Sequence, residues 1–62
     1  MTISELKKET IQLMEKHPSL KEEIKDFYYL AISEIEEGGS ESHECQLALS
    51  SMQEIIEEEN ER

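Results

Sequence analysis

The chain has 62 residues, of which sixteen are acidic and six are Lys or Arg, giving a formal net charge of -10 at pH 7. A chain this short is expected to form one domain that buries only about 60% of the surface its unfolded form exposes, and its one cysteine, Cys45, excludes an internal disulfide or a cysteine-based zinc site. The longest apolar run, residues 27–32, is far shorter than the ~20 residues of a membrane span, and acidic helices would be repelled by anionic lipid, so we expect no membrane binding. The single cysteine suits the reducing cytoplasm, where we expect the protein to be found.

A first helix is predicted over residues 3–16. Thr2 and Glu5 have the spacing of a capping box, in which each side chain accepts a hydrogen bond from the backbone amide of the other residue. Pro18 disfavours helical geometry in the residue before it, which sets the end of the helix. One face of this helix carries Ile3, Leu6, Thr10, Leu13, Met14 and His17. His17, at the end of that face, is expected to cap free carbonyls rather than to serve a functional site.

A second helix is predicted over residues 20–37. Ser19 and Glu22 repeat the capping-box spacing at its start. Gly38 and Gly39 end it, because glycine readily adopts the left-handed conformation found just after a helix. The apolar residues cover an arc of about 140°, wide enough to contact two neighbouring helices. They are Leu20, Ile24, Phe27, Tyr28, Ala31, Ile32 and Ile35.

A third helix is predicted over residues 41–58, with Ser40 as its N-cap. Its apolar face carries Cys45, Ala48, Leu49, Met52, Ile55 and Ile56. Residues 59–62 contain no apolar anchor and are expected to fray. Because the connections are short, consecutive helices should pack antiparallel. The sequence therefore predicts an all-α fold, in which residues 1–62 form a single acidic domain built as an up-down-up three-helix bundle.

The sequence offers no catalytic, cofactor-binding or metal-binding motif. His43 and Cys45 are two residues apart, so on a helix they point in nearly opposite directions and cannot share a metal ion. Cys45 is instead expected to act as a small buried hydrophobic residue. Three short helices leave little room for a catalytic cleft, and the acidic residues would repel the phosphates of nucleic acid. We therefore expect a non-enzymatic protein that does not bind nucleic acid directly.

The acidic residues are unevenly distributed along the chain. Residues 1–25 hold five acids and five bases, whereas residues 26–61 hold eleven acids and no Lys or Arg. One outer face of the third helix gathers His43, Leu47, Glu54, Glu57, Glu58 and Glu61 within about 100°. Glutamates four residues apart on a helix repel each other and destabilise it. Because sequence features that destabilise the local structure often occur at functional sites, this face is a candidate binding surface. A solvated face that keeps the protein soluble is the alternative interpretation.

Tyr29, Leu30 and Leu47 lie off the main apolar faces of the predicted helices. If they cluster they would form a docking or dimer patch, although single exposed apolar residues are ordinary. Together with the acidic face, they favour a protein–protein interaction module, an adaptor or inhibitor that docks on a partner protein with a basic surface. The alternative is a structural unit that self-associates, for example as a homodimer, with its charge serving only solubility.

Overall fold

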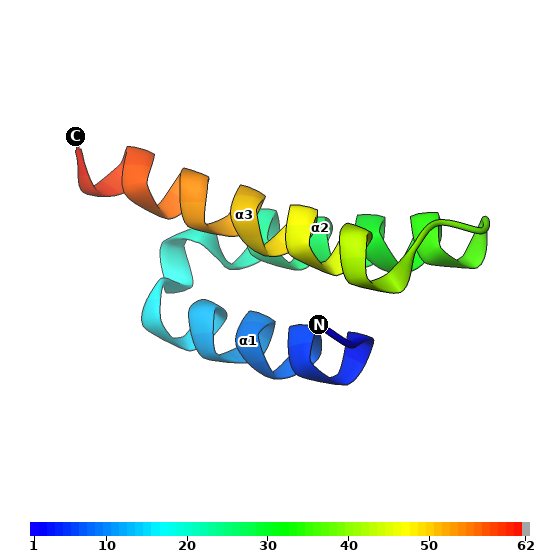
Figure 1. Cartoon of the computed structure of the whole chain (residues 1–62). Coiled ribbons are helices and arrows are strands. Elements are labelled where there is room, and N and C mark those ends of the chain that lie inside the picture. Colours follow the sequence, from blue (N-terminus) through cyan, green and yellow to red (C-terminus); the bar gives the residue numbers. More distant parts are fainter. Residues whose placement is uncertain (62) are drawn as a thin grey trace.

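The computed structural model describes residues 1–61 (Figure 1). Within these residues the elements are α1 (Ile3–Lys16), the short 3-10 helix η1 (Pro18–Leu20), α2 (Lys21–Glu36) and α3 (Glu41–Asn60). The directions of α1 and α3 agree and α2 runs against them, which confirms the predicted three-helix bundle. The bundle is elongated, with extents of 37 × 17 × 17 Å. None of the described helices is both long and apolar enough to cross a membrane.

The capping box at the start of α1 is confirmed. The Glu5 amide donates to Oγ1 of Thr2 at 3.2 Å, and the Thr2 amide donates to Oε1 of Glu5 at 3.0 Å. Two hydrogen bonds from Thr2 lower the pKa of Glu5, because both favour the charged carboxylate. The bond from the Thr2 amide has the larger effect and the bond from the Thr2 hydroxyl the smaller one. At the other end of α1 the backbone of His17 supplies the cap, its N–H donating to the Leu13 carbonyl at 2.8 Å.

The predicted second capping box, at Ser19 and Glu22, is wrong. Pro18 begins the one-turn helix η1, because its fixed φ angle suits the first position of a helical turn. The N-cap of α2 is then Leu20, which makes no side-chain capping bond, and α2 begins at Lys21. Ser19 is left free to bond elsewhere, and its hydroxyl donates to Oε1 of Glu59 on α3 at 2.8 Å.

Gly38 and Gly39 connect α2 to α3 through a Schellman turn. The Gly38 amide donates to the Ile35 carbonyl at 3.1 Å, and the Gly39 amide donates to the Glu34 carbonyl at 2.9 Å. Gly38 has a φ of 107°, the left-handed conformation predicted for this position. A Cβ at Gly39 would lie 2.8 Å from the Glu34 carbonyl oxygen, so the turn needs glycine there too. Ser40 then caps α3 as predicted.

The core lies between the three helices and contains two alanines at the interface of α2 and α3. Its fully or nearly fully buried apolar residues are Leu6, Ile24, Ala31, Cys45, Ala48 and Met52. Thr10 is also buried, and its hydroxyl donates to the Leu6 carbonyl at 2.7 Å. Among the described residues no buried side-chain nitrogen or oxygen lacks a hydrogen-bond partner.

Two carboxylates of α3 hold this helix against α1 and η1. Oε2 of Glu41 accepts from the Ile3 amide at 2.9 Å, at the start of α1. Glu59 accepts from Ser19 in η1, nearly the full length of α3 away. α3 continues to Asn60, two residues beyond its predicted end. Fraying of residues 59–62 stays a prediction, and Arg62 lies outside the described residues.

Candidate functional site

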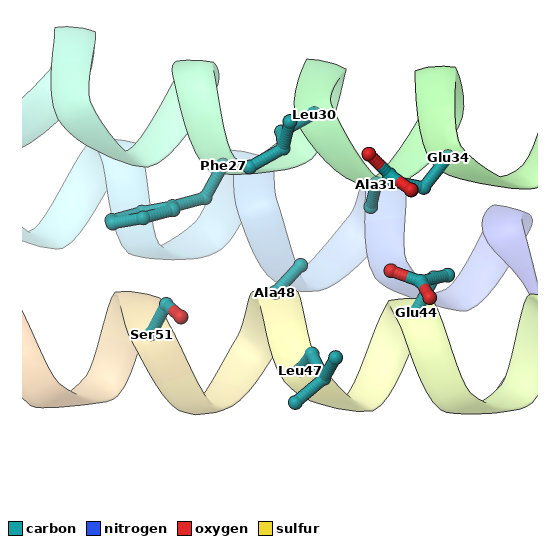
Figure 2. A pocket seen from close by; sticks show the side chains of 8 residues that line it. All are labelled: Phe27, Leu30, Ala31, Glu34, Glu44, Leu47, Ala48 and Ser51. Atoms are coloured by element: carbon teal, nitrogen blue, oxygen red, sulfur yellow. The ribbon is translucent and has the colours of Figure 1, made fainter.

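A groove runs between α2 and α3 on the face turned away from α1. Near the turn at Gly38 and Gly39 it widens into a hollow of about 300 Å³. This leucine hollow is lined by Phe27, Leu30, Ala31 and Glu34 from α2 and by Glu44, Leu47, Ala48 and Ser51 from α3. Figure 2 shows α2 and α3 side by side with α1 behind them, so the hollow opens to solvent on the side away from α1.

The leucine hollow has an apolar floor and an acidic border. Its floor contains two buried alanines, one from each helix. Leu30 and Leu47 stand on opposite walls and are 58% and 49% exposed. At the end nearest the turn, the carboxylates of Glu34 and Glu44 lie on opposite walls of the groove (Figure 2). The hollow therefore offers apolar surface bordered by negative charge.

The spacing of the residues explains why they meet. The lining residues recur every three or four positions over residues 27–34 of α2 and residues 44–51 of α3, so each set forms one stripe along its helix. Each stripe includes the buried alanine of its own helix. Because α2 and α3 are antiparallel, the end of the first stripe faces the start of the second.

The groove continues toward the other end of the helix pair. A second hollow, of about 220 Å³, is lined by Leu20, Glu23, Ile55, Glu58 and Glu59. It lies about one turn before Phe27 and about one turn after Ser51, the order that antiparallel helices require for one continuous groove. The described residues that line the two hollows include five glutamates and no Lys or Arg. We call the two hollows together the α2–α3 groove.

Basic residues lie instead between α1 and α2. A hollow of about 170 Å³ there is lined by Lys7, Thr10, Ile11, Met14, Lys25, Tyr28 and Tyr29. Lys25 donates to Glu22 at 3.1 Å, and this hydrogen bond raises the pKa of Lys25. Tyr29 is 60% exposed, with its ring edge-on to that of Tyr28 and the ring centres 5.5 Å apart. The apolar surface on this side of the molecule therefore has bases beside it.

The structure brings together only part of the predicted site. Leu30 and Leu47 share the leucine hollow, and Glu58 lines the second hollow. Tyr29 lies on the α1–α2 side, so the apolar patch in the groove contains the two leucines without the tyrosine. The remaining predicted residues are exposed on α3 and line neither hollow of the groove. They are His43, Glu54, Glu57 and Glu61.

Sequence reasoning did not single out Glu34, Glu44 or Glu23 as site residues. A signal for the first two is present in the chain, because each stands five residues from Gly39. A tight turn at that glycine places them opposite each other on antiparallel helices. Glu23 is identified only once the register of the two helices is known along their whole length.

Cys45 and His43 do not form a shared site. Cys45 is fully buried, whereas His43 is exposed. Burial raises the pKa of the Cys45 thiol, and the negative charge of Glu41 adds to this effect, so the thiol is protonated at neutral pH. Residues 1–61 contain no group of three or more His, Cys, Asp or Glu side chains placed to hold a metal ion.

Comparisons of the chain with protein-family models, with curated proteins and with solved structures found no match. Its function is therefore inferred from the chemistry of the α2–α3 groove.

Proposed function

We propose that this protein is a non-enzymatic interaction module, an adaptor or inhibitor, that docks its acidic helical face on a basic surface of a partner protein. The α2–α3 groove is the centre of that face. The observation that supports this function is a pair of half-exposed leucines, Leu30 and Leu47, set within a border of carboxylates. Protein interfaces commonly combine an apolar centre with a polar rim. We place the module in the cytoplasm, because its one thiol, on Cys45, needs no oxidising compartment.

The charge of the groove selects the class of partner. Five glutamates line the two hollows, and the exposed acids Glu54, Glu57 and Glu61 extend the negative surface along α3. Such a field attracts Lys and Arg and raises the rate at which a basic protein is encountered. It repels the phosphates of nucleic acid and of anionic lipid, so a basic protein surface is the matching ligand.

The face is large enough for a specific complex. A standard interface buries about 800 Å² on each partner, which is about a fifth of the 4367 Å² accessible surface of this protein. Between residues 44 and 59 of α3 the groove is about 22 Å long. A partner of standard interface size would therefore cover the groove together with neighbouring acids of α3.

Self-association through the same groove is the weaker alternative, because charge opposes it. A two-fold dimer would bring Glu34 and Glu44 of one copy close to the acids of the other. Each copy carries a net charge of -10, and exposed charges still interact over ~8 Å at physiological ionic strength. Light scattering over a range of protein concentrations separates the two functions, since only the structural alternative requires a larger species in the absence of a partner.

Affinity capture with matched variants tests the proposed function. The bait is the full chain, used at low and high salt in a lysate of its source cell, and captured proteins are then purified and measured by titration calorimetry. The groove variant carries Leu30→Ser and Leu47→Ser. The control variant carries Ile11→Ser and Tyr29→Ser, which remove exposed apolar groups from the α1–α2 side.

We expect a basic partner that binds the wild-type and control proteins with the same affinity. Its affinity for the groove variant should be lower by about tenfold or more, because residues at the centre of an interface contribute most of the binding energy. Added salt should weaken all three complexes. A purified partner that binds the groove variant as tightly as the wild type, or whose affinity is independent of salt, contradicts the proposal.

A further inference from the structure

We infer that the partner element bound by the α2–α3 groove is a basic amphipathic α-helix, which lies along α2 and α3 as the fourth helix of a bundle. This inference rests on the proposed function and adds the shape and residue pattern of the ligand. It is carried by the length of the groove, the separation of its two hollows, the chemistry of its lining and the position of its charges.

The groove has the shape of a vacant helix position. α1 covers one side of the α2–α3 pair, and the other side is open (Figure 2). A helix packs most closely on two antiparallel helices when it lies in the groove between them, with axes about 8–10 Å apart, and this is how a four-helix bundle is completed. The ~22 Å between residues 44 and 59 of α3 matches a helix of about fifteen residues.

The two hollows set the spacing of apolar side chains on the ligand. Along this part of the chain the second hollow is lined by Leu20 and Glu23 and is centred midway between them, whereas the leucine hollow is centred near Leu30. The centres are therefore about nine residues, or ~14 Å, apart along the helix. Residues at positions i and i+7 of a ligand helix are ~10.5 Å apart, and those at i and i+11 are ~16.5 Å apart. Apolar residues at i, i+4, i+7 and i+11 share one face and reach both hollows.

The lining favours a helix over an extended segment. Its polar side chains, among the described residues, are five glutamates and Ser51, and the backbone groups of α2 and α3 are engaged within their own helices. An extended peptide would bury backbone N–H and C=O groups against the two alanines, where they find no hydrogen-bond partner. Burying such groups unpaired costs free energy and weakens binding. A helix satisfies its backbone internally and presents only side chains to the groove.

The charges of the groove lie at both ends of this path. Glu34 and Glu44 border the leucine hollow, and Glu23, Glu58 and Glu59 border the second hollow. A ligand helix with Lys or Arg beside its first and last apolar anchors would pair with both groups. An acidic helix with the same apolar pattern would be repelled at each end.

Two synthetic peptides of equal composition test this inference. Each has eighteen residues of leucine, lysine and alanine. The amphipathic peptide carries leucine at i, i+4, i+7 and i+11, and the permuted peptide distributes the same leucines around the helix. Each is titrated into the isotope-labelled full chain, and amide chemical shifts and the dissociation constant are measured by NMR. The protein variants are Leu47→Ser and the pair Glu34→Gln with Glu44→Gln, and the control pair is Glu9→Gln with Glu15→Gln on α1.

The amphipathic peptide should bind at least tenfold more tightly than the permuted peptide, with the largest shifts at Ala31, Ala48 and Ser51. Both groove variants should weaken it several-fold, and the control pair should not. Equal binding of both peptides, with shifts spread over the outer acids of α3, would overturn the helical ligand while leaving an acidic docking face. Failure of both peptides to bind at low salt would overturn both proposals. Groove shifts that depend on protein concentration without peptide would assign the groove to a second copy and also overturn the inference.

Discussion

Cys45 lies in the core with Leu6, Ile24 and Met52, the other large side chains that have no contact with solvent. Its sulfur is therefore surrounded by apolar groups, and the charged thiolate is disfavoured. The acidic residue that adds most to this effect is Glu41, which also accepts a hydrogen bond from the start of α1. The burial of Cys45 was predictable from its place on the apolar face of its helix, because that property depends only on local periodicity.

The raised pKa of Cys45 predicts a loss of stability at alkaline pH. The thiol has a higher pKa in the folded protein than in the unfolded chain, so its contribution is fully present below the unfolded value of ~8.5 and is lost as pH rises through the folded value. The free energy of unfolding, measured with urea, should fall by up to about 1.4 kcal/mol per pH unit above that point. Cys45→Ala should lack this slope between about pH 8 and 9.5. Equal slopes for the two proteins would show that the thiol is not responsible.

At the scale of the element, α3 combines a well-defined start with an unfavourable end. Ser40 caps its first turn, and Glu41 and Glu44 lie there, where negative charge suits the helix dipole. Its last turns carry glutamates four residues apart and no base among the described residues. Burial of its apolar face, rather than local preference, therefore holds the C-terminal half of α3 in place.

Reversing one of these charges should stabilise the protein. In Glu57→Lys the new base lies three residues after Glu54 and four before Glu61, and it suits the dipole at the end of the helix. We expect the free energy of unfolding in urea to rise by about 0.5–1 kcal/mol. Glu57→Gln, which only removes charge, should give a smaller increase. A Glu57→Lys protein no more stable than the wild type would mean that this carboxylate makes a favourable contact.

The elements themselves were largely predictable from the sequence, because their boundaries depend on neighbouring residues. The capping box at Thr2, the turn at Gly38 and the cap at Ser40 all involve bonds within five residues along the chain. The start of α2 was mispredicted because Pro18 forms a separate turn and Ser19 bonds to α3, forty positions away. The pattern of neighbouring residues in the sequence does not indicate a hydrogen-bond partner that lies so far along the chain.

The site was less predictable than the elements for the same reason. Helical projection identified Leu30 and Leu47 as apolar residues outside the core, but each projection treats one helix alone. Their meeting, and the separation of Tyr29 from them, depends on the rotation and register of α2 against its neighbours. The pairing of Glu34 with Glu44 follows only when the turn and both helices are considered together.

The whole molecule separates its charge by face. The α2–α3 groove is lined by acids, whereas Lys7 and Lys25 line the hollow between α1 and α2. A net charge of -10 on 62 residues also makes the folded state repel itself more strongly than the extended chain does. The fold and the proposed complex should therefore respond to salt in opposite directions.

Raising NaCl from ~20 to ~500 mM should increase the melting temperature, because the Debye length falls from roughly 20 Å to a few ångströms and repulsion is screened. If screening contributes about 1 kcal/mol, the rise is about 4–8 °C for a domain of this size. Circular dichroism during heating measures it. A variant with Glu57→Lys and Glu61→Lys, which carries less net charge, should respond less. A melting temperature that falls with salt would show that attractive pairs outweigh repulsion.

Two hydrogen bonds fix the position of α3 along its axis, one near each end of the helix. One joins Glu41 to the Ile3 amide and the other joins Glu59 to Ser19. Sliding α3 along its axis by a single turn, about 5.4 Å, would break both. The alignment of the two groove walls is therefore set partly by bonds that lie outside the leucine hollow, and a change at Ser19 can alter what the leucine hollow accepts without touching it.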